Sequence, residues 1–171
     1  MEGVKLLARI TGASRKGDDG LMRAITSYIQ EKGFTIIGAH ELARDLLVPT
    51  GQLGKVSPTE RDKADITAGM RIVKAVGALD IGQAAIIRDG YVLAVEAAEG
   101  TDGLLSRSAA FAWEERAGVL VKLSKPGQEL KADMPTIGPD TVTLAAEANL
   151  RGIALEEKKT LILDLKESIR R

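Results

Sequence analysis

The chain contains 171 residues, of which 44% are hydrophobic and 28% are charged, and its 24 basic side chains balance its 24 acidic ones. A net charge of zero argues against a nucleic-acid binder that depends on bulk positive charge, and aromatic residues at 3% are too few for a base-stacking surface. The absence of cysteine excludes disulfides and thiolate metal sites. No run approaches the roughly 20 apolar residues of a membrane span.

The amino-terminal part of the chain predicts an amphipathic helix. Residues 6–11 are a short apolar run that leads into a polar loop over 12–19. Gly33 is well placed to end the helix that follows in the left-handed conformation. The helix itself is indicated by apolar side chains at helical spacing, which are Leu21, Ile25, Tyr28 and Ile29.

Residues 34–37 are rich in β-branched side chains and predict a strand. Residues 38–41 then open a short helix that ends before Pro49, because the residue before a proline disfavours helical geometry. Residues 50–57 carry glycine and serine and predict a loop.

A longer helix is predicted to begin at Ser57, with Pro58 in its first turn and Glu60 three residues after the cap. It should run to about residue 78. We expect it to bury one face, which consists of Ile66, Met70, Val73 and Gly77.

The middle of the chain predicts a β-hairpin followed by a further strand. Two apolar runs, 84–87 and 91–95, flank the pair Asp89-Gly90, which favours the tight turn of a two-residue hairpin loop. Residues 119–123 predict the next strand.

The remaining elements are a helix over 139–149, a strand over 152–155, a strand over 160–163 paired with it or close by, and a charged helix from Asp164. Strands separated by helices, with two hairpin-like pairs, predict an α/β fold with a mixed β-sheet flanked by helices. We expect a single domain, because a boundary in the loop before the long helix would leave elements too short to stand alone.

The densest polar group follows the predicted hairpin. Glu96 and Glu99 stand just before Thr101 and Asp102, at a corner between a strand and a helix. Free N–H groups at the start of a helix bind anions, and carboxylates beside a phosphate site supply the oxygen ligands that Mg²⁺ takes. The alternative is a helix capped by Thr101 or Asp102 with a solvated acidic turn.

Two lysines leave the predicted strand over 119–123. Lys122 and Lys125, with Gln128 just after, would neutralise phosphates as mobile point charges. The alternative is that these lysines only protect a strand edge against aggregation.

A loop of alternating proline and glycine precedes the predicted helix over 139–149. Asp133 enters this loop, which is suited to holding an acid firmly for metal binding or for activating water. The alternative is a turn in which Asp140 caps the helix.

Together these segments resemble the catalytic C-terminal domain of the bacterial UDP-2,3-diacylglucosamine pyrophosphatases of the DUF1009 (LpxI) type. Matches occur in order over residues 6–164, and the two most specific are the acidic corner and the loop Asp-x-Pro-Thr-Ile-Gly-Pro from Asp133. The segments that carry the resemblance cover residues 14–19, 23–25, 38–42, 80–84, 92–102, 118–122, 125–128 and 133–141.

The resemblance implies Mg²⁺-dependent hydrolysis of the pyrophosphate in UDP-2,3-diacylglucosamine, a step of lipid A synthesis, to UMP and 2,3-diacylglucosamine 1-phosphate (lipid X). It implies catalytic roles for Asp133, Asp102 and Glu99, and metal binding by Glu96, Glu99, Asp102 and Asp133. The substrate-binding residues that it implies are Arg15, Lys16, Gly100, Thr101, Lys122, Lys125, Gln128 and Thr136.

Family members carry an N-terminal domain before this region, and we expect that domain to be absent here, with residues 1–12 a linker or first strand. We expect a cytoplasmic protein that contacts the inner membrane peripherally through its lipid substrate and binds no nucleic acid. Two other functions remain open, a non-catalytic ligand-binding module of the same fold and a phosphohydrolase of another nucleotide sugar. A requirement for the acyl chains would distinguish hydrolysis of UDP-2,3-diacylglucosamine from hydrolysis of another nucleotide sugar.

Overall fold

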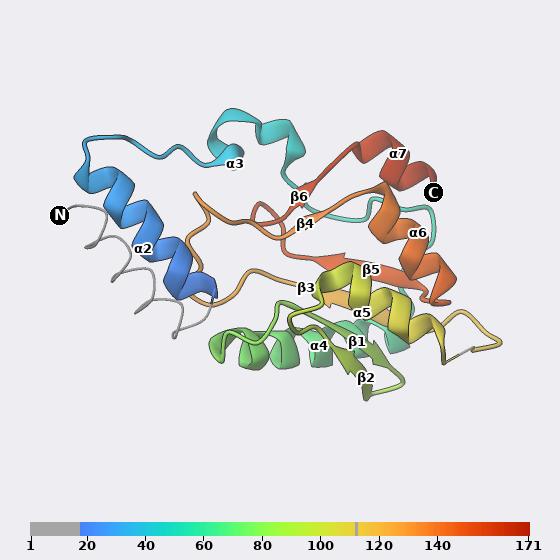
Figure 1. The fold of residues 1–171 in the computed structure, drawn as a ribbon. Coiled ribbons are helices and arrows are strands. Elements are labelled where there is room, and N and C mark those ends of the chain that lie inside the picture. The colour runs from blue at the N-terminus through green and yellow to red at the C-terminus, as the bar shows by residue number, and fades with distance from the viewer. Residues whose placement is uncertain (1–17, 112) are drawn as a thin grey trace.

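The computed structural model describes residues 18–111 and 113–171 (Figure 1). The apolar run over 6–11 and the two predicted binding residues Arg15 and Lys16 lie outside these ranges. The helices are α2 (Asp18–Glu31), α3 (Ala39–Leu42), η1 (Arg44–Leu46, a 3-10 helix), α4 (Glu60–Ala78), α5 (Gly100–Ala109), α6 (Pro139–Glu147) and α7 (Leu165–Arg170). The strands are β1 (Ala84–Arg88), β2 (Tyr91–Val95), β3 (Val119–Lys122), β4 (Thr136–Ile137), β5 (Gly152–Leu155) and β6 (Leu161–Ile162).

The main sheet has four strands in the order β2-β1-β3-β5. Strand β1 runs antiparallel to both β2 and β3, whereas β3 and β5 are parallel. A second sheet consists of the parallel strands β4 and β6. The predicted α/β fold with a mixed sheet and flanking helices is therefore confirmed.

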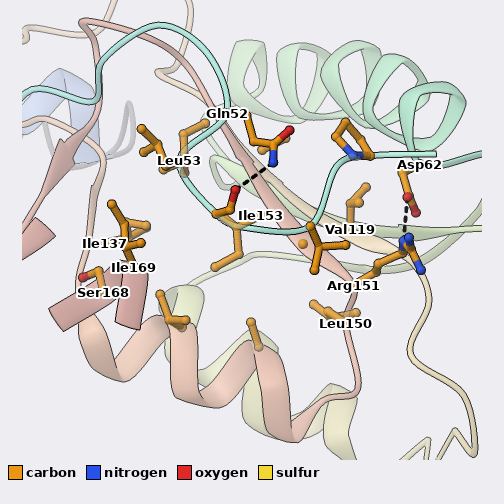
Figure 2. A pocket seen from close by; sticks show the side chains of 18 of the residues that line it. Gln52, Leu53, Asp62, Val119, Ile137, Leu150, Arg151, Ile153, Ser168 and Ile169 are labelled. Atoms are coloured by element: carbon orange, nitrogen blue, oxygen red, sulfur yellow. Dashed lines mark hydrogen bonds and ion pairs between the residues drawn. The ribbon is translucent and has the colours of Figure 1, made fainter. Parts of the chain in front are cut away.

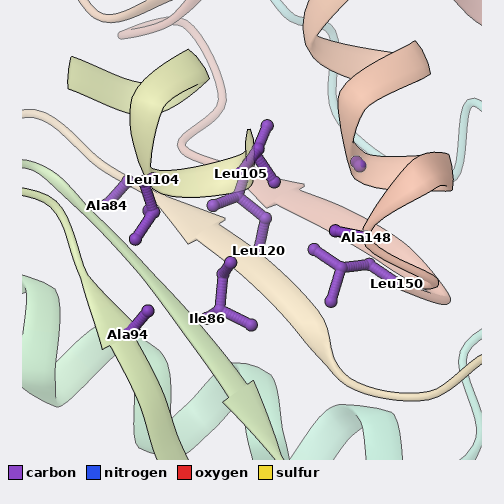
Figure 3. Packing of buried hydrophobic residues seen from close by; sticks show 9 residues of the cluster. Ala84, Ile86, Ala94, Leu104, Leu105, Leu120, Ala148 and Leu150 are labelled. Carbon is purple, nitrogen blue, oxygen red and sulfur yellow. The ribbon is translucent and has the colours of Figure 1, made fainter. Parts of the chain in front are cut away.

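The alternation of side chains along the strands gives the main sheet two apolar faces, one of which is shown in Figure 3. Ile86 and Leu120 pack with Leu104 and Leu105 of α5 on one face. Ile87 and Val121, from the same two strands, pack on the other face in a cluster that includes Val73 of α4. Because side chains alternate, Lys122 lies on the same face of β3 as Leu120, toward α5.

The predicted hairpin is confirmed. Asp89 and Gly90 have φ values of +53° and +79°, which is the left-handed geometry that a two-residue turn of this kind requires. Asp65 of α4 supports the turn, because its carboxylate accepts hydrogen bonds from the N–H groups of Asp89 (2.9 Å) and Gly90 (2.7 Å).

Helix α4 ends where the sequence predicts but begins later. Its N-cap is Thr59, whose hydroxyl accepts from the N–H of Asp62, and Ser57 lies outside the helix. The buried face also differs, since Met70 is 39% exposed and Gly69 is buried instead. A Cβ on Gly69 would lie 2.5 Å from Cγ2 of Val121, so the glycine lets α4 approach the sheet closely.

One strand prediction is wrong. Residues 34–37 form no strand, and Phe34 and Ile37 are 68% and 51% exposed; within residues 18–111 and 113–171, no strand pairs with this segment. The strand predicted over 160–163 is present as β6, and it pairs with β4, a strand that the sequence did not indicate, and not with β5. Helix α2, followed by Gly33 at φ +86°, is confirmed. Among the described helices, none is long and apolar enough to cross a membrane.

Candidate functional site

Three strand ends meet at one edge of the main sheet. Gln83 precedes β1, Glu96 follows β2 and Lys122 ends β3. Since β1 is antiparallel to both neighbours, its first residue Ala84 is in register with Lys122, and its carbonyl accepts a 2.9 Å hydrogen bond from the N–H of Glu96. Helix α5 starts four residues after Glu96, so its first turn lies at the same edge.

A chain of hydrogen bonds joins Glu96, Thr101 and Lys122 at this edge. Glu96 is only 5% exposed, and its Oε1 accepts a 2.7 Å hydrogen bond from the Thr101 hydroxyl. Its Oε2 accepts from the N–H of Gln83 at 2.9 Å. The Thr101 hydroxyl oxygen in turn accepts from Nζ of Lys122. Both Glu96 oxygens are therefore engaged by the protein itself.

The close approach of two backbone segments makes this arrangement possible. A Cβ on Gly82 would lie 2.1 Å from the carbonyl oxygen of Glu96, so only glycine fits there without a backbone shift. The N–H of the next residue, Gln83, thereby reaches the Glu96 carboxylate.

Lys122 is 4% exposed, which makes its ammonium a fixed charge and not the mobile strand-end lysine that the sequence suggested. Burial lowers the pKa of Lys122 below its ordinary value, and the negative charges of Glu96, Asp102 and Asp133 oppose this shift. These three carboxylates therefore lie close enough to act on the Lys122 ammonium.

Asp102 and Asp133 are the exposed members of this group. Asp102 lies in the first turn of α5, and its Oδ1 is 3.5 Å from the hydroxyl of Thr141 in α6. Asp133 lies in the loop before β4, and its Oδ2 accepts a 2.7 Å hydrogen bond from Nε2 of Gln128. The predicted acidic corner and the predicted Asp133 loop thus each place a carboxylate near enough to influence Lys122.

Lys125 is engaged in an ion pair. Its Nζ lies 2.5 Å from Oδ1 of Asp80, and its N–H donates a 2.9 Å hydrogen bond to Oε1 of Gln128. Asp80 also accepts from the N–H of Asp19, which links the start of α2 to this loop. Lys125 and Gln128 consequently hold the loop that carries Asp133, and their contact with substrate phosphates stays a prediction.

Three more of the predicted site residues form hydrogen bonds outside the group around Lys122. They are Glu99, Gly100 and Thr136. Arg107 holds Glu99 through hydrogen bonds of 3.1 and 3.0 Å, and Glu99's own backbone N–H together with Arg107 lowers the pKa of this carboxyl. The N–H of Gly100 donates to the carbonyl of Ala97 at 3.2 Å. The Thr136 hydroxyl donates to the carbonyl of Met134.

The start of α5 also differs from the alternative in which Thr101 or Asp102 caps the helix. Its N-cap is Glu99, without a side-chain cap, and Thr101 and Asp102 lie inside the first turn. Similarly, the N-cap of α6 is Gly138, and Asp140 lies two residues into that helix.

A separate pocket of about 700 Å³ lies between the loop over 49–58, β5, α6 and α7 (Figure 2). Its walls are chiefly apolar, and the ion pair between Asp62 and Arg151 stands at one end. None of the predicted site residues lines it. Sequence reasoning did not find this pocket, because its walls come from segments far apart in the chain.

No group of three or more His, Asp or Glu side chains suited to a metal ion occurs within residues 18–111 and 113–171. The oxygen donors at the sheet edge are instead the exposed pair Asp102 and Asp133. Two carboxylates suit Mg²⁺ where substrate phosphates supply further ligands, because this ion usually keeps several waters.

Comparison with known proteins divides the chain near residue 47. The model of the LpxI C-terminal domain matches residues 49–171, and the model of the LpxI N-terminal domain matches residues 1–46. The second match corrects the prediction that the N-terminal domain of the family is absent, because it assigns residues 1–46 to that domain. Helix α2 lies within it.

The chain is also 45% identical, over 168 residues, to the UDP-2,3-diacylglucosamine pyrophosphatase LpxI of Caulobacter vibrioides. The alignment covers 95% of this chain and 60% of that relative, so the chain spans about three fifths of the relative's length. On the C-terminal match and this identity together, the chain belongs to the LpxI family.

Proposed function

We propose that this chain hydrolyses the pyrophosphate bond of UDP-2,3-diacylglucosamine to UMP and 2,3-diacylglucosamine 1-phosphate, a step of lipid A biosynthesis. The identity to a relative named for this activity supports the proposal. The structural observation that supports it is the buried Lys122 ammonium, which donates to Thr101 in the first turn of α5 and feels the negative charges of the exposed Asp102 and Asp133.

Phosphoryl transfer requires positioning and charge neutralisation more than covalent help from the protein. In the proposed reaction Asp133, oriented by Gln128, accepts a proton from the water that attacks phosphorus. The Lys122 ammonium and the amino-terminal end of α5 supply positive potential beside it, which favours a bound pyrophosphate.

The proposed reaction uses Mg²⁺, which Asp102 and Asp133 would hold together with substrate phosphates. The ion would supply further neutralisation of the phosphate charge. We leave Glu96 out of this ligand set because both of its oxygens accept hydrogen bonds from the chain, and Glu99 because it pairs with Arg107.

The proposed substrate carries two acyl chains, which partition into a bilayer. We therefore propose peripheral contact with the cytoplasmic face of the inner membrane during turnover. Co-sedimentation with vesicles should then depend on the presence of this lipid.

The test is incubation of the chain with UDP-2,3-diacylglucosamine and Mg²⁺, with an EDTA control, followed by mass spectrometry of the products. Release of UMP and the lipid monophosphate only with Mg²⁺ supports the proposal. The proposal fails if the Caulobacter relative forms both products under these conditions and this chain forms neither. A UDP-sugar without acyl chains, tested in parallel, reports whether the acyl chains are required.

A further inference from the structure

Thr101 uses its hydroxyl in an unusual way for a residue in the first turn of a helix. A threonine near a helix start commonly bonds to a backbone N–H, but α5 has no side-chain cap. The hydroxyl instead donates to Glu96 and accepts from Lys122. One hydroxyl has the donor and the acceptor capacity to do both.

The two charges on either side of Thr101 are both buried. Glu96 and Lys122 are 5% and 4% exposed, and a buried charge is costly unless it is matched and hydrogen-bonded. Glu96 supplies the opposite charge for Lys122, and Thr101 stands between the two. Because the Thr101 hydroxyl is fixed by its own hydrogen bond to Glu96, it holds the ammonium in one direction.

The Glu96 end of this series of hydrogen bonds is fixed to the backbone. The N–H of Gln83 donates to Oε2 of Glu96, and this contact depends on the close approach at Gly82. The carboxylate therefore has little freedom to turn. The position of the ammonium relative to Asp102 and Asp133 is thus set from within the protein core.

We propose that Glu96 is a positioning residue which, through the hydroxyl of Thr101, holds the Lys122 ammonium in place for the site formed with Asp102 and Asp133. This inference rests on the proposed hydrolysis and replaces the metal-binding role that the family resemblance suggested for Glu96. Glu96 acts through Lys122 and does not touch the substrate.

The test compares Thr101→Val, Thr101→Ser and Glu96→Gln in the full chain. One measurement is the NMR signal of the Lys122 ammonium, assigned with Lys122→Arg, and the protection of its protons from exchange with water. The other is the Mg²⁺-dependent release of UMP, resolved into kcat and KM. The control is Thr67→Val, because Thr67 is exposed on α4 and its hydroxyl bonds only to the local carbonyl of Lys63.

We expect Thr101→Val and Glu96→Gln to abolish the protection and to lower kcat about tenfold or more, the usual weight of a hydrogen bond to a charged group, while KM changes little. Thr101→Ser should restore both readouts. Thermal melts of each variant identify any that do not fold, and Thr101→Ser and Glu96→Gln keep the test decisive if Thr101→Val unfolds.

An ammonium that stays protected in both Thr101→Val and Glu96→Gln overturns the positioning role. A lost ammonium signal with unchanged kcat also overturns it. If the unaltered chain releases no UMP, the proposed hydrolysis fails whatever the ammonium signals do. The two failures are therefore distinguishable.

Discussion

Gln128 bridges Lys125 and Asp133, with its Nε2 donating to Oδ2 of Asp133 at 2.7 Å and its Oε1 accepting from the N–H of Lys125 at 2.9 Å. One amide side chain thus connects the proposed base to the segment that follows β3. This segment is also anchored by the ion pair between Lys125 and Asp80. The orientation of Asp133 consequently depends on contacts well outside its own loop.

Gln128→Leu should therefore lower the rate of UMP release by about tenfold, because it removes the hydrogen bond that orients a charged carboxylate. Steady-state kinetics measure the effect, which should fall on kcat. Gln30→Leu, an exposed position on α2, is the matched control. Equal kinetics for Gln128→Leu and the unaltered chain would show that this bridge does not orient Asp133 in the reaction.

Asp133→Ala should reduce hydrolysis by about 10²- to 10⁴-fold, the usual contribution of a general base. Its melting temperature should stay close to that of the unaltered chain, because Asp133 is exposed. The matched control is Asp140→Ala, because this carboxylate is also exposed and pairs with Arg171 at the surface. Near-normal hydrolysis by Asp133→Ala would remove this residue from the mechanism.

The pH dependence of hydrolysis should carry an alkaline limb that belongs to Lys122. Burial lowers the pKa of Lys122, and the proposed reaction needs the protonated form. Activity should hence fall as the pH rises through a pKa below that of an ordinary lysine. Because the unfolded chain keeps this proton to higher pH, folding stability should increase with pH between the lowered and the ordinary pKa.

A profile of log kcat/KM against pH measures this limb, and Lys122→Arg provides the comparison. The guanidinium does not titrate in this range, so the limb should disappear from the residual activity of the variant. An identical alkaline limb in Lys122→Arg would assign it to another group.

Asp65→Ala should destabilise the fold and leave the proposed catalytic residues unaltered. The carboxylate is buried and accepts two backbone hydrogen bonds from the β1–β2 turn, so its loss should cost about 2–3 kcal/mol. Differential scanning calorimetry should show a decrease in melting temperature, whereas Asp45→Ala, at an exposed position in η1, should melt like the unaltered chain. Unchanged stability in Asp65→Ala would mean that the β1–β2 turn is stable without the Asp65 carboxylate.

Elements that depend on local chemistry were predictable from the sequence. The pair Asp89-Gly90 determined the hairpin, because left-handed turn geometry is a property of those two residues. The apolar repeat of α2 and the apolar run of β5 were equally local, and the structure confirms both elements. Asp102, Lys122 and Asp133 also come from motifs within short segments, and their roles stay predictions.

Only the tertiary structure decided how these segments combine. Residues 34–37 have the composition of a strand but pair with no strand in the part of the chain that the structure describes, whereas β6 pairs with β4, a strand too short for the sequence to indicate. Glu96 and Lys122 looked like surface charges in the sequence, yet the meeting of β1, β2 and β3 buries them. Strand pairing and the burial of a charge are set by residues distant along the chain, and no local pattern encodes that proximity.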